Sequence, residues 1–361
     1  MMEDNHPTQN TLPQNREEKV LLEYSFGSKK RGFAAFLIGC ALLIAAFAIT
    51  ALWIEGKDDG AFGKQDEGAH DTALPTAEPT GDAPNGTQDP LLQGQSPVEI
   101  PQGAVAIVSK DLSCSALGNG YLHNETDYIP SLNELLNWKT GEYSESTAPR
   151  VLILHTHTSE GYLKDGCAYV EGSVGDATYS DRAEENVLSV GEVLCQTLNE
   201  KGIPSIHCQT SHDATGLSGA YERSAETVRA YLRDYPSIEY VIDLHRDSVM
   251  ASDGSIIRSE TEINGEPTAQ VMAVVGSDRN GTAYANGWEH NLALALQLRE
   301  LLNANGATLC RPVSLRTSSF YQELSKYGLL LEIGTAANSP EEAKRAAVLV
   351  GEALAQLIQA R

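Results

Sequence analysis

The 361-residue chain is poor in positive charge, with 26 Lys and Arg against 49 Asp and Glu and a formal net charge of −23. Binding to nucleic acid depends on Lys and Arg at the phosphates, and binding to anionic lipid depends on basic clusters. The acidic balance therefore argues against a nucleic-acid-binding protein and against a broad basic surface for lipid. The length suits one or two domains with additional segments.

The motifs of several common enzyme classes are also missing. The sequence has no H-E-x-x-H, G-x-S-x-G or Walker loop, so it gives no support to a zincin, a serine hydrolase or a P-loop protein. The six cysteines form no C-x-x-C pattern, so thiolate ligation of zinc is not expected. Five of them follow Cys40 at scattered spacing, which defines no disulfide framework, although one disulfide pair stays open.

An apolar run from Phe33 to Ile54 contains no charged residue. As a helix its 22 residues would extend roughly 33 Å, enough to cross a hydrocarbon core of about 30 Å. A Lys-Lys-Arg cluster at 29–31 precedes it, so residues 1–32 are predicted to be a cytoplasmic tail and the remainder to lie outside. A cleaved signal peptide is disfavoured, because the run exceeds the roughly 7–15 residues of a signal core.

The chain after this span divides by composition. Residues 55–101 are rich in Gly, Asp, Pro, Thr and Gln, which predicts a disordered acidic linker. Residues 102–148 are interpreted as an N-terminal extension of the ectodomain, with a strand at 105–108 and a short helix at 131–138. Residues 149–361 have the regular pattern of a catalytic domain.

Apolar runs and helical periodicity alternate in this last region. They predict strands at 151–154, 204–208, 240–244, 270–275 and 329–331, and helices at 181–201, 221–235, 288–304 and 339–360. Ser339, Pro340 and Glu342 have the spacing of a capping box. The alternation predicts an α/β domain with a mainly parallel mixed sheet flanked by helices, whose site lies at the carboxyl ends of the strands.

The first polar cluster, His155-Thr-His157-Thr-Ser-Glu160, directly follows the strand at 151–154. Imidazole and carboxylate groups are the usual ligands of a catalytic zinc. His157 and Glu160 form an H-x-x-E loop whose side chains can turn to one point. A polar loop without metal is the alternative, but the position after a core strand, beside the second histidine His155, favours a Zn²⁺ site.

The second cluster, Asp243-Leu-His245-Arg-Asp247, ends the strand at 240–244. His245 would supply a further zinc ligand. Asp243 or Asp247 could accept the other ring N–H of a ligand histidine, as often happens around metal sites. A buried structural histidine paired with an aspartate is the alternative for His245.

The third cluster places Glu332 at the end of the strand at 329–331. A carboxylate there is costly to bury without a partner. A role as the general base that activates the attacking water would account for it, and a salt bridge to Arg246 or another basic residue is the alternative.

Glu184 opens the helix at 181–201 near the predicted site and is an alternative metal ligand. It also stands three residues after Asp181, so a capping position explains it more simply. His207 and His212 are interpreted as bystanders.

Three motifs together, with the apolar span and linker before them, resemble the stage II sporulation protein P family over roughly residues 100–361. They are Leu154-His-Thr-His-Thr-Ser-Glu160, Val241-Ile-Asp-Leu-His-Arg-Asp247 and Leu331-Glu-Ile-Gly334. The resemblance implies a membrane-bound peptidoglycan hydrolase of endospore-forming bacteria, similar in fold to zinc N-acetylmuramoyl-L-alanine amidases.

By position, the resemblance implies that His157 and His245 are metal ligands and that Glu332 is catalytic. For the middle ligand it leaves Glu160 and Glu184, of which Glu160 is favoured because it belongs to the family motif. His155 would then support a ligand or face the substrate.

The resemblance also implies a substrate, a partner and a location. The cleaved bonds would be the amide between N-acetylmuramic acid and L-alanine and a peptide cross-link. The partner would be the lytic transglycosylase stage II sporulation protein D, at the sporulation septum during engulfment.

Arg246 would bind a substrate carboxylate or neutralise Asp247. A metallocarboxypeptidase-like peptidase and a non-catalytic wall-binding septal scaffold are the alternative functions.

Overall fold

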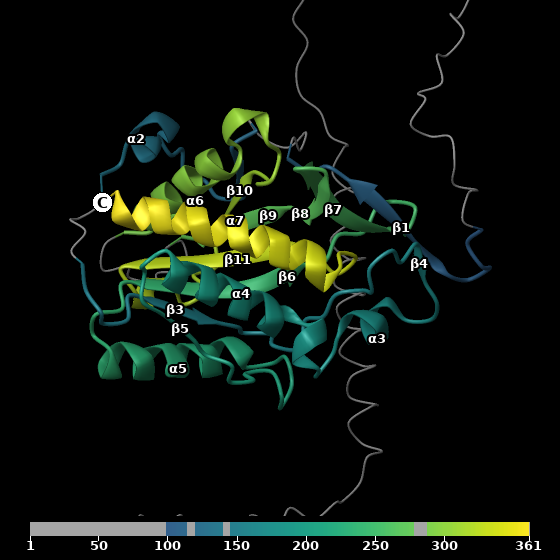
Figure 1. Ribbon diagram of the computed structural model, residues 1–361, viewed down its shortest axis with the longest axis horizontal. Coiled ribbons are helices and arrows are strands. Elements are labelled where there is room, and N and C mark those ends of the chain that lie inside the picture. The colour runs from purple at the N-terminus through teal and green to yellow at the C-terminus, as the bar shows by residue number, and fades with distance from the viewer. Residues whose placement is uncertain (1–98, 114–119, 140–144, 278–286, 361) are drawn as a thin grey trace, which may run out of the picture. The chain divides into compact units, whose positions relative to one another are not determined.

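The computed structural model describes residues 99–113, 120–139, 145–277 and 287–360 (Figure 1). These residues all belong to one unit, Gln88–Arg361. The predicted cytoplasmic tail, the apolar run at 33–54 and nearly all of the linker lie outside them. In the part of the chain that is described, no helix combines the length and the apolar character needed to cross a bilayer.

A seven-stranded sheet forms the centre of the fold. Its order is β2 (Leu122–Asn124), β10 (Val313–Arg316), β9 (Val271–Gly276), β11 (Tyr327–Thr335), β6 (Tyr240–Asp247), β3 (Val151–Leu154) and β5 (Ser205–His207). All neighbouring strands are parallel except β9 and β11, which are antiparallel. The predicted mainly parallel mixed sheet is confirmed.

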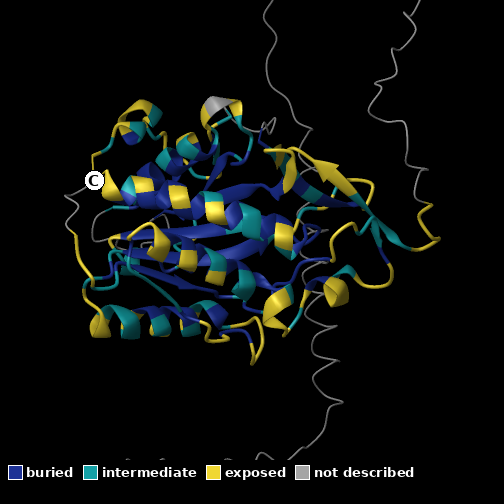
Figure 2. Ribbon diagram, viewed as in Figure 1, coloured by how far each residue is buried: buried dark blue, intermediate teal, exposed yellow. Residues whose placement is uncertain are grey.

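Helices cover both faces of this sheet (Figure 1). The described helices are α2 (Leu132–Leu136), α3 (Val174–Thr178), α4 (Val187–Glu200), α5 (Ala220–Asp234), α6 (Glu289–Leu302) and α7 (Pro340–Gln359), with 3-10 turns at Ala183–Glu185, Ala304–Gly306 and Gln322–Leu324. Of these, α3 packs apart from the seven-stranded sheet, with Val174 against Val170 and Ile256. Apolar residues of α4, α6 and α7 share one core with Ile153, Ile242 and Leu331. The other face packs against α5 through Leu152 and Val241. The central strands β3, β6, β9 and β11 are almost wholly buried between these layers, whereas the edge strand β5 is only partly buried (Figure 2).

A second, four-stranded sheet was not predicted from the sequence. Its order is β4 (Tyr169–Val170), β1 (Val105–Lys110), β7 (Ile256–Ile263) and β8 (Glu266–Ala269). Asn264 and Gly265, with φ of 54° and 84°, make the turn between β7 and β8. An Asn-Gly pair between two strands is a strong hairpin signal, so the hairpin of β7 and β8 could have been predicted from the sequence. β1 and β2 show that the predicted N-terminal extension contributes a strand to each sheet.

The helix predicted from residue 181 begins later, at Val187, so this boundary was wrong. Ala183–Glu185 form a 3-10 turn, and the side chain of Asn186 accepts the amide proton of Leu188 at 2.9 Å. Asparagine is a strong N-cap because its short side chain satisfies a free amide of the first turn. The capping box of Ser339 and Glu342 at the start of α7 is confirmed.

The cysteines that the structure describes are free thiols: Cys167, Cys195, Cys208 and Cys310.

Candidate active site

The strand register brings the three polar clusters to one end of the sheet. β11 and β6 run in parallel with Glu332 directly opposite His245. β3 pairs with the other side of β6, with Leu154 opposite Asp243, so the His155–Glu160 loop begins beside the same strand end. Side chains at paired positions of parallel strands lie on the same face of a sheet. Convergence of the three strand ends is therefore a consequence of pairing between segments that are far apart in the sequence.

His245 is buried at the point where the three polar clusters meet. Its Nδ1 lies 3.1 Å from Glu160 Oε2, and its Nε2 lies 3.0 Å from Asp243 Oδ2 in an ion-pair contact. Burial alone lowers the pKa of His245, but the charges of Asp243 and Glu160 outweigh it and hold the pKa well above its usual value. Two carboxylates thus stabilise positive charge at this point.

His157 stands next to His245, with ring centroids 5.5 Å apart and planes at 77°. Its Nδ1 is buried and has no hydrogen-bond partner among the described residues. Burial is the main cause that lowers the pKa of His157. The ring therefore presents a neutral nitrogen that a cation could use, and a buried nitrogen without a partner is unusual in a folded protein.

Glu332, like His157, has a buried polar atom without a hydrogen-bond partner among the described residues. Its side chain is partly buried, and the atom is Oε2. Burial is the main cause that raises the pKa of Glu332 to about 8; His245 opposes the rise and Glu160 adds to it. A carboxyl group that titrates near neutral pH can both accept and return a proton, as a general acid–base group must.

Asp243 fixes the start of the His155–Glu160 loop. It accepts hydrogen bonds from Thr156 N and Thr156 Oγ1, both at 2.8 Å. Thr156 Oγ1 also lies 3.0 Å from the hydroxyl of Tyr321. Tyr321 and its neighbour Phe320 have φ of 46° and 52°, a costly conformation for residues other than glycine. Asp243 also contacts His245 Nε2 at 3.0 Å, and its role beside a ligand histidine stays a prediction. Nothing local in the sequence pointed to Tyr321.

Asp213 fixes the far end of the same loop and was also missed. It accepts from Thr158 Oγ1 at 2.6 Å and from the amide of Ser159 at 3.0 Å. These bonds lower its pKa against the effect of burial, which raises it. Asp213 stands in a stretch of mixed polar residues after β5, where no motif marks it.

His155 lies apart from His157. It is fully buried, with Nδ1 2.8 Å from Leu244 O and Nε2 2.8 Å from His207 Nε2. Burial lowers the pKa of His155 to about 3. His207, interpreted as a bystander, is therefore its partner, and His212 contacts His155 through the backbone oxygen at 2.7 Å.

The guanidinium of Arg246 bonds outside the cluster formed by His157, Glu160, His245 and Glu332, whereas its backbone amide donates to Glu160 Oε2 at 3.2 Å. It donates to Gly161 O at 2.9 Å and to Thr178 O at 2.8 Å, and its guanidinium lies 5.0 Å from the ring centre of Tyr179. Asp247 instead pairs with Arg311 at 2.7 Å. The salt bridge considered between Arg246 and Glu332 is not among these contacts.

Glu184 is also outside the cluster. Its side chain is 67% exposed and pairs with Arg182 at 3.0 Å. The structure therefore brings Glu160, and not Glu184, to His245.

Within the described residues, no group of three or more His, Cys, Asp and Glu side chains is already arranged to bind a metal ion. The donors nevertheless fit one. The separation of 3.1 Å between Glu160 Oε2 and His245 Nδ1 is close to the roughly 3.3 Å edge of a tetrahedron with zinc–ligand distances of about 2.0–2.1 Å. His157 adds a buried nitrogen without a partner. These three residues are the ones that could hold zinc.

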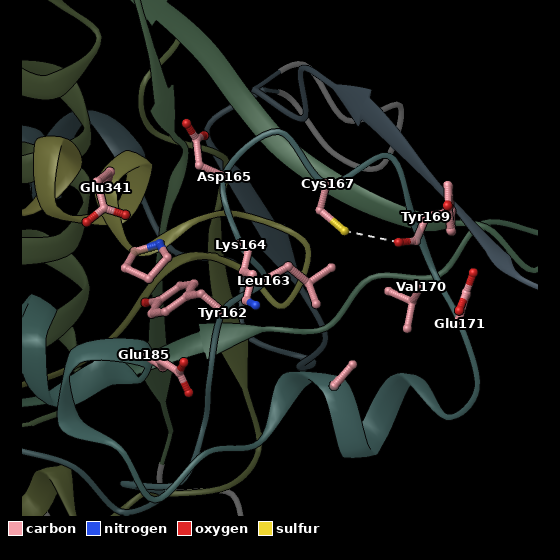
Figure 3. A pocket seen from close by; sticks show the side chains of 12 residues that line it. Tyr162, Leu163, Lys164, Asp165, Cys167, Tyr169, Val170, Glu171, Glu185 and Glu341 are labelled. Atoms are coloured by element: carbon pink, nitrogen blue, oxygen red, sulfur yellow. Dashed lines mark hydrogen bonds between the residues drawn. The ribbon is translucent and has the colours of Figure 1, made fainter. Parts of the chain in front are cut away.

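A cavity of about 480 Å³, a volume typical of ligand sites, is lined by residues other than His157, Glu160, His245 and Glu332 (Figure 3). Tyr162 and Leu163, which closely follow Glu160, line it together with Val170. The hydroxyl of Tyr162 donates to Ile333 O at 2.9 Å, next to Glu332.

A family model for stage II sporulation protein P matches residues 108–355, more than half of the chain. The chain belongs to the stage II sporulation protein P family. His157, Glu160, His245 and Glu332 all lie within the part that matches this family.

The family member of Bacillus subtilis (strain 168), stage II sporulation protein P, is 28% identical over 218 residues, which are 57% of this chain and 50% of the relative. The chain thus spans about half the length of that curated relative. Among solved structures, N-acetylmuramoyl-L-alanine amidase AmiC2 of Nostoc punctiforme aligns with a TM-score of 0.35 and 16% identity, over 60% of this chain and 99% of that one. The CwlD amidase of Clostridioides difficile, solved with the GerS lipoprotein, aligns with a TM-score of 0.33 and 13% identity, over 58% and 94%.

Proposed function

We propose that this protein is a zinc-dependent peptidoglycan hydrolase that cleaves the amide between N-acetylmuramic acid and L-alanine. Membership of the stage II sporulation protein P family supports the substrate class. The observation that carries the proposal is the pair Glu332 and His245. They stand opposite each other on two parallel strands, with a free buried carboxylate oxygen beside an imidazole in contact with Glu160.

In this proposal His157, Glu160 and His245 hold the zinc ion. When bound, zinc supplies a Lewis acid for the amide carbonyl and for water. Asp243 keeps the ring of His245 in place from the opposite side. Glu332 Oε2 takes a proton from the attacking water and passes it to the nitrogen of the leaving amine. A pKa near neutrality suits Glu332 for both transfers.

Further parts of the proposal concern the setting. A peptide cross-link is a second candidate bond, and the cavity beside Tyr162 has room for part of a peptide or sugar. Residues 33–54 would anchor the chain as a single-pass membrane protein with the catalytic domain outside. The place of action would be the sporulation septum during engulfment, with stage II sporulation protein D, a lytic transglycosylase, as partner. The apolar run and the family name support these points.

The test uses the purified full-length chain, isolated cell-wall sacculi and mass analysis of released products. Free stem peptides that begin with an L-alanine amine are expected from the wild type. Glu332→Gln should lower kcat by about 10²–10⁴-fold while zinc remains bound. Products cut only within the peptide would favour a metallocarboxypeptidase-like peptidase, and wall binding without metal or hydrolysis would favour a scaffold.

A matched pair of variants tests the middle ligand. Glu160→Gln should abolish stoichiometric zinc, since Glu160 contacts His245. Glu184→Gln should keep zinc and activity, because the exposed side chain of Glu184 pairs with Arg182 at the surface. Zinc loss in Glu184→Gln with retention in Glu160→Gln would reverse the assignment.

A further inference from the structure

Tyr221, near the start of α5, is an aromatic residue that no motif singled out. Its ring meets that of His157 edge-on, with centroids 5.6 Å apart and planes at 89°. It lies nearly parallel to the ring of His245, at 13° and 6.4 Å. One partly buried tyrosine therefore faces both imidazoles that could hold zinc.

The ring of Tyr221 also packs against two other aromatic side chains. Phe320 and Tyr321 lie 5.9 Å and 6.0 Å from it, centroid to centroid. Both belong to the segment with positive φ, whose strain is maintained by its packing. Further along α5, the hydroxyl of Ser224 lies 2.9 Å from Thr156 Oγ1, which ties the helix to the His155–Glu160 loop. A group fixed in this way needs no reorganisation when it acts on a substrate.

The ring contacts with His157 and His245 place the phenol of Tyr221 at the candidate ligands. Asp243 and Glu160 contact His245, and Glu332 stands opposite His245 on the neighbouring strand. The three carboxylates are hydrogen-bond acceptors when ionised, and a phenol at neutral pH is a donor. Tyr221 thus adds a neutral donor to a cluster that is rich in acceptors.

We propose that the Tyr221 hydroxyl donates a hydrogen bond to the carbonyl oxygen of the scissile amide, where negative charge develops as water attacks. This inference rests on the proposed hydrolase function. Loss of one donor of this kind costs about 10²–10³ in kcat where the donors act alone. Because zinc would share the same oxygen, the expected loss here is about 10–10²-fold.

The experiment compares full-length Tyr221→Phe with wild type on a purified muropeptide whose N-acetylmuramoyl–L-alanine amide is intact. Phenylalanine keeps the ring contacts with His157 and His245 and removes only the hydroxyl. We expect kcat to fall about 10–10²-fold, with KM and zinc affinity within about twofold of wild type. Tyr231→Phe on the same helix is the control, since Tyr231 stacks on Tyr235 instead; its kinetics should match wild type.

The outcomes separate the two proposals. If the wild type releases the expected stem peptide and Tyr221→Phe has the same kcat, the hydroxyl has no catalytic role and the inference is overturned. The inference is also overturned if Tyr221→Phe loses zinc but keeps wild-type kcat per bound zinc, because the tyrosine would then only position the ligands. A wild type that cleaves no amide overturns the proposed function and this inference with it.

Discussion

Gly191 in α4 is a sensitive probe of how the buried histidine pair supports the site. A Cβ added there would lie 2.6 Å from His155 Nε2 and 2.7 Å from His207 Nε2. Those nitrogens are themselves 2.8 Å apart. Real Cβ atoms essentially never approach other atoms so closely, and neither ring has free space because both are largely buried. Gly191→Ala must therefore push the pair apart.

The size of the effect follows from three terms. Alanine is favoured over glycine in a helix by about 0.5–1 kcal/mol. Overpacking a buried site costs about 1–3 kcal/mol, and the hydrogen bond between the two rings contributes about 0.5–1.5 kcal/mol. The expected net loss in free energy of unfolding is about 0.5–4 kcal/mol, opposite in sign to the usual effect of this substitution in an exposed helix.

Urea unfolding followed by circular dichroism measures this loss. Gly175→Ala in α3 is the control, because its added Cβ would meet only Ser173 Oγ at 3.5 Å. It should be neutral or stabilise by up to about 1 kcal/mol. If Gly191→Ala proves as stable as wild type, or more so, then the close packing of His155 and His207 against α4 is not as the structure has it.

Three further results are expected. Burial raises the pKa of Asp243, but the charge of His245 and the hydrogen bonds that Asp243 accepts outweigh this effect. They lower the pKa of Asp243 from 3.8 to about 2. The pKa of Asp243 is thus lower in the folded protein than in the unfolded chain. Its ionised form therefore adds roughly 2 kcal/mol to the free energy of unfolding above about pH 4, and this contribution is lost as the pH falls through about 2. Acid titration of unfolding should show this loss in wild type and less of it in Asp243→Asn. Arg246→Met leaves the buried carbonyl of Gly161 without its donor, whereas Thr178 O keeps the amide of Gly161 as a donor. Thermal unfolding of Arg246→Met should therefore show a loss of about 1–3 kcal/mol. The exposed Arg182→Met should change stability by less than about 0.5 kcal/mol, and equal losses would contradict the buried role of Arg246. Zinc at 100 times its Kd should stabilise the wild type by about 2.7 kcal/mol. A chelator should reverse this stabilisation, and His245→Ala should not show it. An unchanged melting temperature with zinc would count against the metal site.

Much of the architecture was predictable because it depends on local pattern. The apolar run Val151–Leu154 became β3 with the same bounds, and the helix before the C-terminus began at its capping box. The start of α4 failed because two capping signals compete, one at Asp181 and one at Asn186. The second sheet was missed because its pairings join segments that are far apart in the chain, and only the Asn-Gly turn between β7 and β8 marked it locally.

By itself, the sequence determined which residue types stand at the ends of apolar strands, and so it pointed to His157, His245 and Glu332. It could not decide between Glu160 and Glu184, because each had a plausible local context. The tertiary structure placed Glu160 3.1 Å from His245 and left Glu184 in solvent. It also brought Tyr221 to the two imidazoles. Those contacts depend on strand register and on helix packing across the sheet, and these are set by the burial of the whole core.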